Sequence, residues 1–319
     1  MYLAVLAIII LLAGCLDNQS NNQKPLVSND QQGGIEIIRE TERMDTNYIP
    51  ITNTSNNSVI DWGNVPEQKQ RDVENYTFMP YDPLIITFFN VGFGEKQGRM
   101  VLIRRGTLDI YIWSVPEETY AKAYSFIKSY SDDIEYVIIP SARDLNFETY
   151  YRLKSDFQVG KTIAPENIRL YRNDTFDIYL KQGDVLELAG FKIEVLQAGK
   201  DYLQSNPGDM SLVLKVSMND TCMIFLLDIE TGGLQRLNSD NVYRFRCDYF
   251  SWNAYGVYFL PDLYLNFFNY FGPKHMIADG SAFGLYDRGT RLGLYQRASV
   301  YNISVARVWE NETVTIIFK

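Results

Sequence analysis

The chain has 319 residues, of which 46% are hydrophobic and 14% aromatic, enough to bury the core of one large domain or two small ones. Its net charge is −9, and an acidic surface of this kind disfavours non-specific binding to the phosphate backbone of nucleic acids. The chain has a single histidine, His275, whereas zinc sites near neutral pH use several imidazoles, so a standard di-zinc hydrolase is excluded.

The chain begins with an apolar run that ends at Leu12. It is shorter than the ~20 residues of a membrane span and fits a secretory signal peptide. The run closes with "LAGC", which resembles a lipobox, so we expect cleavage before Cys15 and attachment of lipid to its thiol. No Lys or Arg precedes the run. Residues 1–15 could therefore also stay as an uncleaved anchor. Either outcome places the protein outside the cytoplasm, at the outer face of the cell membrane.

Residues 16–80 are rich in Asn, Gln, Ser, Thr, Asp and Glu, with few hydrophobic residues to bury. This composition predicts a disordered polar tether, followed by one folded domain over residues 81–319. Glycosylation triplets are compatible with an exported glycoprotein, although an Asn-rich chain contains many by chance. The triplets begin at Asn18, Asn53, Asn56, Asn75, Asn173, Asn219, Asn302 and Asn311.

The remaining chain alternates between predicted strands and predicted helices. Strands are expected at 84–91, 100–105, 108–115, 134–139, 184–196 (a hairpin), 211–217, 222–228, 246–252 and 274–278, with a terminal hairpin through "ARVWE" and "TVTIIFK". Helices are expected at 117–130, from about 147, near 231–238, at 261–271 and near 288–297. Alternation in both halves favours an α/β (α+β) fold with two sheets inside and helices outside, a four-layer αββα sandwich.

Two cysteines remain besides Cys15. Cys222 and Cys247 each lie near the start of an apolar run. If the two runs are neighbouring parallel strands, both thiols lie at the same end of a sheet, and an oxidising compartment would allow a disulfide. Two small buried side chains are the alternative.

The stretch "EYVIIPSARDLNFETYY", residues 135–151, changes abruptly from an apolar run to a polar loop. This pattern is typical of a buried parallel strand that delivers a loop to a site at its carboxyl end.

Four further segments carry a resemblance: "NVGFGE" (90–95), "GDVLELAGFKIEVLQA" (183–198), "NPGDMSLVLKV" (206–216) and "IFLLDIE" (224–230). Residues 84–319 resemble the metallo-β-lactamase fold, and most closely the extracytoplasmic β-lactamase-like domain of ComEC-type DNA-uptake proteins. The resemblance implies a sandwich with a two-metal hydrolytic site built on the loop after residue 139.

The metal ligands that the resemblance implies are mostly replaced. The two His positions of the loop fall on Ser141 and Asn146, and the two Asp positions fall on Arg143 and Leu145. Arg143 would repel a divalent cation. Asn253 falls near the positions of a later pair of His ligands in the family. Only Asp228, at the position of a bridging Asp, keeps a ligand side chain.

Zinc needs about three protein ligands to activate water, and one remains. We therefore expect a metal-free domain with vestigial ligand positions and no catalytic residues. An oxygen-only site for Mg²⁺ or Ca²⁺ at Asp228, Asp144 and Asp279 is the alternative. Asp228 can also be interpreted as a turn-forming or capping residue.

Other features suggest no second site. His275 has no partner at an informative spacing, and neither Ser141 nor Ser251 has a plausible base. The aromatic segment 249–271 could form a cleft, a partner surface or a packed layer. The Arg-rich segment 287–297 could bind an anion or form a solvated face.

These observations predict a membrane-tethered extracytoplasmic lipoprotein with a degenerate, non-catalytic domain that binds an envelope protein or a small-molecule ligand. A metal-dependent phosphodiesterase or nuclease with a rearranged carboxylate site is the first alternative. An accessory role in DNA uptake is the second, and the net charge of −9 opposes it.

Overall fold

A computed structural model describes residues 76–92, 98–131, 133–198, 211–229, 233, 237, 246–253, 272–279, 298–308 and 313–319. All of them belong to one of the two units into which the chain divides, Ile35–Lys319. The predicted signal segment 1–15 and most of the predicted tether 16–80 lie outside the described residues. So do most of the predicted helices at 231–238, 261–271 and 288–297.

The first sheet has seven strands in the order β14-β1-β2-β3-β4-β5-β6. Pairing is antiparallel from β14 to β3 and parallel from β3 to β6. The strands are β1 (Leu84–Phe89), β2 (Arg99–Arg105), β3 (Leu108–Ser114), β4 (Asp133–Ile138), β5 (Gln158–Pro165), β6 (Ile178–Leu180) and β14 (Thr313–Phe318).

The second sheet also has seven strands, in the order β13-β12-β11-β10-β9-β8-β7. Again one half is antiparallel, from β7 to β10, and the other parallel, from β10 to β13. The strands are β7 (Val185–Leu188), β8 (Phe191–Gln197), β9 (Val213–Met218), β10 (Thr221–Phe225), β11 (Tyr249–Asn253), β12 (His275–Asp279) and β13 (Ser304–Arg307).

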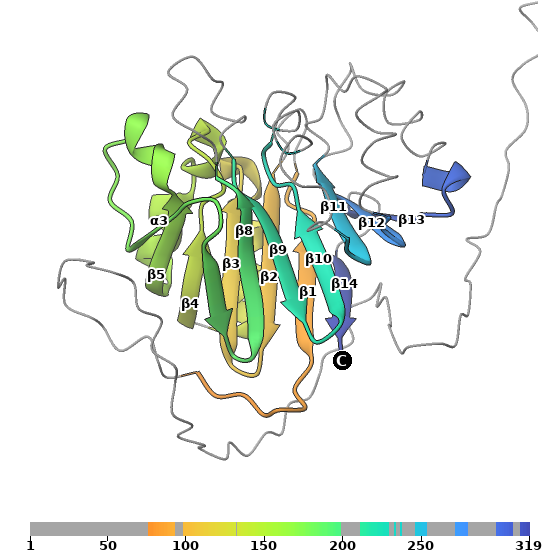
Figure 1. Ribbon diagram of the computed structural model, residues 1–319. Helices are drawn as coiled ribbons and strands as arrows, with labels where there is room; N and C mark the ends of the chain where they lie inside the picture. Colours follow the sequence, from red (N-terminus) through yellow and green to blue (C-terminus); the bar gives the residue numbers. More distant parts are fainter. Residues whose placement is uncertain are drawn as a thin grey trace, which may run out of the picture. The chain divides into compact units, whose positions relative to one another are not determined.

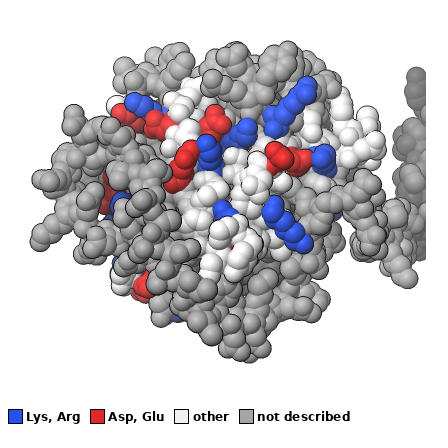
Figure 2. Space-filling view, turned by 60° about the horizontal axis from the view of Figure 1, so that its bottom comes forward, with Lys and Arg blue, Asp and Glu red and all other residues white. Residues whose placement is uncertain are grey.

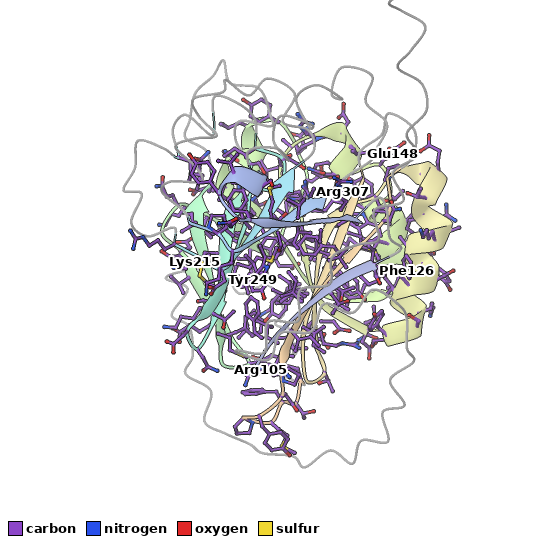
Figure 3. All side chains as sticks on the ribbon, turned by 90° about the vertical axis from the view of Figure 1, so that its right-hand side faces the viewer. Arg105, Phe126, Glu148, Lys215, Tyr249 and Arg307 are labelled. Carbon is purple, nitrogen blue, oxygen red and sulfur yellow. A yellow bond between two sulfur atoms is a disulfide. The ribbon has the colours of Figure 1, made fainter. Side chains whose placement is uncertain are left out.

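The two sheets pack face to face around a central core (Figure 1). Alternate residues of each strand point into it, as the two-residue period of a strand requires. Phe88 of β1 stacks on Phe225 of β10, with ring centroids 5.8 Å apart. Tyr249 of β11, labelled in Figure 3, packs in the same core. The α/β sandwich expected from the alternation of elements is therefore confirmed.

Helices cover the outer face of the first sheet. The helical elements are η1 (Glu117–Thr119), α2 (Tyr120–Tyr130), η2 (Asp144–Asn146), α3 (Tyr150–Asp156) and η3 (Glu166–Leu170). Tyr120, Ala123 and Ile127 form the buried stripe of α2, and Phe126 packs beside that layer (Figure 3). On the second sheet, Leu237 and Ala298 belong to a separate outer cluster.

The predicted hairpin at 184–196 forms as β7 and β8, with its turn at Ala189 and Gly190. The predicted terminal hairpin is wrong: β13 pairs with β12 in the second sheet, whereas β14 pairs with β1 in the first. Each strand instead forms an edge of a different sheet, so the two do not pair with each other as a hairpin. Strands β5 and β6 were not predicted, because "QVGKTIAP" and "IYL" lack a clear strand pattern.

A short segment before β1, which we call the strap (residues 76–82), closes the lower end of the sandwich. Tyr76 and Phe78 pack against the central core. Arg105, only 5% exposed, donates hydrogen bonds to the carbonyls of Pro80 and Asp82 in the strap and of Ala189 in the β7–β8 turn. The folded part therefore begins before the expected boundary at residue 81.

Figure 3 places Arg105 at this lower end, beneath both sheets. Figure 2, which looks towards this end, shows Lys and Arg interspersed with Asp and Glu and no broad area of one sign among the coloured residues. Among the described residues, no helix is long and apolar enough to span a membrane.

Candidate vestigial metal site

The polar loop that follows β4 meets residues of the second sheet at the upper end of the sandwich. β4 ends at Ile138 and β10 ends at Phe225, so both strands deliver their following loops to this end. The backbone N–H of Leu212, just before β9, donates to the carbonyl of Pro140 at 2.9 Å and joins the two sheets. Arg99, the first residue of β2, pairs in register with Ser114, the last residue of β3, and so also lies at this end.

Asp228 is the centre of a buried polar group here. It is 1% exposed, and Arg99 is 2% exposed. Arg99 Nη1 donates to Asp228 Oδ1 at 2.8 Å, and Arg99 Nη2 donates to the carbonyl of Leu227 at 3.0 Å. One guanidinium thus compensates a carboxylate that could not remain charged in this environment alone.

The second carboxylate oxygen is occupied by loop residues. Ser141 Oγ donates to Asp228 Oδ2 at 2.7 Å, and Asn146 Nδ2 donates to the same oxygen at 2.8 Å. The Asn146 amide also reaches Ser141, at 2.9 Å from both its carbonyl and its hydroxyl oxygen. We call Arg99, Ser141, Asn146 and Asp228 the Asp228 cluster.

The backbone around Asp228 is held in an unusual conformation. Leu227 has φ of 51°, in the left-handed region that is rare for a branched residue. Its side chain is completely buried in the central core, which holds it there despite the strain. Ser211 Oγ accepts a hydrogen bond from the backbone N–H of Asp228 at 3.0 Å. The strained turn therefore aims the carboxylate at Arg99 and the loop after β4.

The charge state of Asp228 follows from these contacts. Burial alone would raise its pKa, but the charges of Arg99 and Arg143 and the hydrogen bonds from Asn146 and Ser141 outweigh burial. The net effect is a pKa below the usual value for an aspartate. Asp228 is therefore an anion at neutral pH.

Not all of the predicted positions converge. Ser141, Asn146 and Asp228 come together, and Arg143 lies close enough for its charge to act on Asp228. Leu145 lies in η2 and is partly exposed, with no described contact to the carboxylate. Asp144 points away: its side chain is fully exposed and pairs with Arg172.

Asn253 and Asp279 are partners in register at the ends of β11 and β12, but their side chains lie outside the described part. The "FSWNAYG" loop is described only to residue 253. Most of the aromatic segment 249–271 and all of the Arg-rich segment 287–297 lie outside the described residues as well.

The donor set does not fit a metal ion. A cation needs ligand lone pairs, yet around Asp228 the neighbouring groups present N–H and O–H donors to the carboxylate. A second cation at Asp228 would also lie within a few ångströms of the fixed charge of Arg99. Over the described ranges, no group of three or more His, Cys, Asp or Glu side chains could hold a metal.

The other predicted features lie away from the cluster. Cys222 and Cys247 form a disulfide between β10 and the start of β11, with Cα atoms 5.1 Å apart. His275, at the start of β12, stacks on Tyr249, and its Nδ1 lies 2.7 Å from Ser304 Oγ. Burial lowers the pKa of His275, with smaller and opposing effects of Asp248 and Lys274.

Sequence reasoning missed Arg99 and Ser211. The signal for Arg99 was present: "RMVLIRR" places a charged residue at the start of a strand whose other residues up to Ile103 are apolar. Its partner, however, lies 129 residues further along the chain, and the sequence alone does not join them.

Comparison with known proteins agrees with this geometry at the level of the fold. No family model matches the chain, and no curated protein matches it. A solved structure of the metallo-β-lactamase fold protein YhfI from Bacillus subtilis superimposes with a TM-score of 0.50 and 10% identity, over 73% of this chain and 100% of that one.

CmlA, a diiron β-hydroxylase from Streptomyces venezuelae, gives a TM-score of 0.46 at 11% identity, over 74% of this chain and 54% of that one. The metallo-β-lactamase GOB-18 from Elizabethkingia meningoseptica gives 0.35 at 14% identity, over 56% of this chain and 75% of that one. Identities this low bear on the fold alone. The chain has the metallo-β-lactamase fold, as the resemblance predicted.

Proposed function

We propose that this chain is a non-catalytic, metal-free protein of the metallo-β-lactamase fold that acts by binding, attached to the outer face of the cell membrane. Its partner is an envelope protein or a small molecule held at the rim of the sandwich. Attachment is through lipid on Cys15 or through an uncleaved N-terminal anchor.

The observation that carries the proposal is that hydrogen-bond donors engage both carboxylate oxygens of Asp228. One of its oxygens accepts from Arg99, and the other accepts from Ser141 and Asn146. A hydrolase of this fold would need these lone pairs for a metal that activates water. The carboxylate instead neutralises a buried arginine, and donors from Arg99, Ser141 and Asn146 engage both of its oxygens.

Two features support the location outside the cytoplasm. The disulfide between Cys222 and Cys247 suits an oxidising compartment. The glycosylation triplets within the described ranges begin at exposed residues, Asn173, Asn219 and Asn302, where a glycan would not disturb the core.

Metal analysis of the full-length protein tests the proposal. The protein is purified from cells grown with added Zn²⁺, Mn²⁺ and Mg²⁺, dialysed, and examined by elemental mass spectrometry and by hydrolysis of bis(p-nitrophenyl) phosphate. We expect substoichiometric metal and no turnover. A full equivalent of metal that is lost in Asp228→Ala, together with turnover, would establish the rearranged hydrolase instead.

The remaining parts of the proposal need their own measurements. Labelling of cells with a radioactive fatty acid tests the lipid anchor. If Cys15 carries the lipid, the wild type is labelled and Cys15→Ser is not. Salt-dependent retention on DNA would favour the DNA-uptake role over binding of an envelope component.

A further inference from the structure

Arg99 joins parts of the molecule that are distant in the sequence. It begins β2 in the first sheet, whereas Asp228 follows β10 in the second. The guanidinium and the carboxylate are each 1% exposed at the side chain, with Nη1 and Oδ1 2.8 Å apart. The ion pair therefore ties the two sheets together inside the protein.

The same carboxylate also holds the loop after β4. Ser141 and Asn146 reach Asp228 across sequence separations of 87 and 82 residues. Ser211, before β9, contacts both the Asp228 backbone and the carbonyl of Pro140. Four chain segments thus meet around Asp228, counting its own.

The charges in this cluster are fixed rather than exchangeable. Arginine does not lose its proton in proteins, and its planar guanidinium group can donate to a carboxylate and a neighbouring carbonyl at the same time. The guanidinium group of Arg99 donates to Asp228 and to the carbonyl of Leu227 in this way. A cation that cannot dissociate then fills the role that a bound ion would otherwise have.

The orientation of Asn146 agrees with this reading. Its Nδ2 faces Asp228 and Ser141, while its Oδ1 has no hydrogen-bond partner within the described ranges. If the amide were reversed to offer Oδ1 as a ligand, two acceptor oxygens would face each other at hydrogen-bond distance. The loop is therefore arranged around a carboxylate that is already neutralised.

We propose that Arg99 is a built-in cation which replaces a metal ion as the link between the two sheets, and that Asp228 retains its position as the ligand of that cation. This inference rests on the proposed metal-free site and adds a role for its residues: the cluster holds the loops at the upper end of the sandwich in one arrangement for binding.

Chemical rescue tests the inference on the full-length protein with its disulfide intact. Arg99→Ala removes the guanidinium and leaves a cavity beside Asp228, and we expect the melting temperature to fall by about 10 °C. Guanidinium or methylguanidinium ion at low millimolar concentration, far below the denaturing range, should refill the cavity and raise the melting temperature of this variant saturably.

Matched variants separate the site from general salt effects. Arg99→Met fills the same cavity without leaving room for the ion, and Arg99→Ala combined with Asp228→Ala has no carboxylate to bind it, so neither should respond. Equal concentrations of sodium chloride should leave all of the variants unchanged. An Arg99→Ala protein that folds but shows no saturable response, or responds equally without Asp228, would overturn the inference.

A second comparison covers the case in which Arg99→Ala does not fold. Arg99→Lys keeps a cation and Arg99→Met keeps only the length of the side chain, so the inference requires the lysine variant to melt higher. Equal or reversed melting temperatures would refute it. Failure of the rescue in a protein shown to be metal-free refutes this inference alone, whereas stoichiometric metal in the wild type refutes the proposed function as well.

Discussion

Removal of the Asp228 carboxylate distinguishes a structural centre from a simple turn residue. In Asp228→Ala, the buried guanidinium of Arg99 keeps its charge but loses its counterion, and Ser141 and Asn146 lose their acceptor. Breaking a buried ion pair from one side costs about 3–5 kcal/mol of folding free energy. If Asp228 only capped a helix, its loss would cost about 1 kcal/mol.

The two values are far enough apart for a single equilibrium measurement. Urea unfolding of the full-length protein, followed by tryptophan fluorescence, gives the free energy of unfolding of the wild type and of Asp228→Ala. Asp144→Ala is the matched control, because it removes a carboxylate from the neighbouring loop whose side chain is fully exposed. We expect little change in the control. A loss of about 1 kcal/mol or less in Asp228→Ala would refute the reasoning about the cluster.

Three further results are expected. Burial raises the pKa of Glu135 from 4.5 to about 7, so the folded state binds this proton more tightly and the stability falls as the pH rises between these values. The free energy of unfolding in urea should be about 1–2 kcal/mol lower at pH 8 than at pH 5, after allowance for solvent screening. Glu135→Gln should remove that difference. The Cys222–Cys247 disulfide closes a loop with a sequence separation of 25. Its reduction should lower the free energy of unfolding by about 3 kcal/mol in the same assay. An unchanged urea midpoint would contradict a stabilising role of the disulfide. Gly190→Ala should lower stability by about 1–3 kcal/mol, because φ is 74° and the added methyl would lie 2.5 Å from Arg105 Nη1; an unchanged melting temperature would show that the turn relaxes freely.

The fold could be predicted from the sequence because its strands are regular. The apolar runs of β1 and β3 and the alternation of β8 mark these segments as strands, and the Ala189–Gly190 turn marks a hairpin by residue type. The destinations of the last two strands could not be predicted in this way. Strands that are consecutive in the sequence usually pair, whereas β13 and β14 are each added at the edge of a different sheet.

The site could be predicted only in part. The positions of Ser141, Asn146 and Asp228 followed from the resemblance, and they converge in the structure. Arg99 could not be assigned, because an arginine at the start of a strand is ordinary until the fold shows that it is buried. The sequence therefore pointed to the Asp228 carboxylate but not to the arginine that neutralises it.

The strap and Arg105 have a consequence for the orientation of the protein. Arg105 and Arg99 are the two ends of β2, a strand of seven residues that separates them by roughly 20 Å. The chain that precedes the domain enters beside Arg105, where the strap is fastened. In the anchored protein that we propose, the point of attachment and the loops around Asp228 therefore lie at opposite ends of the domain.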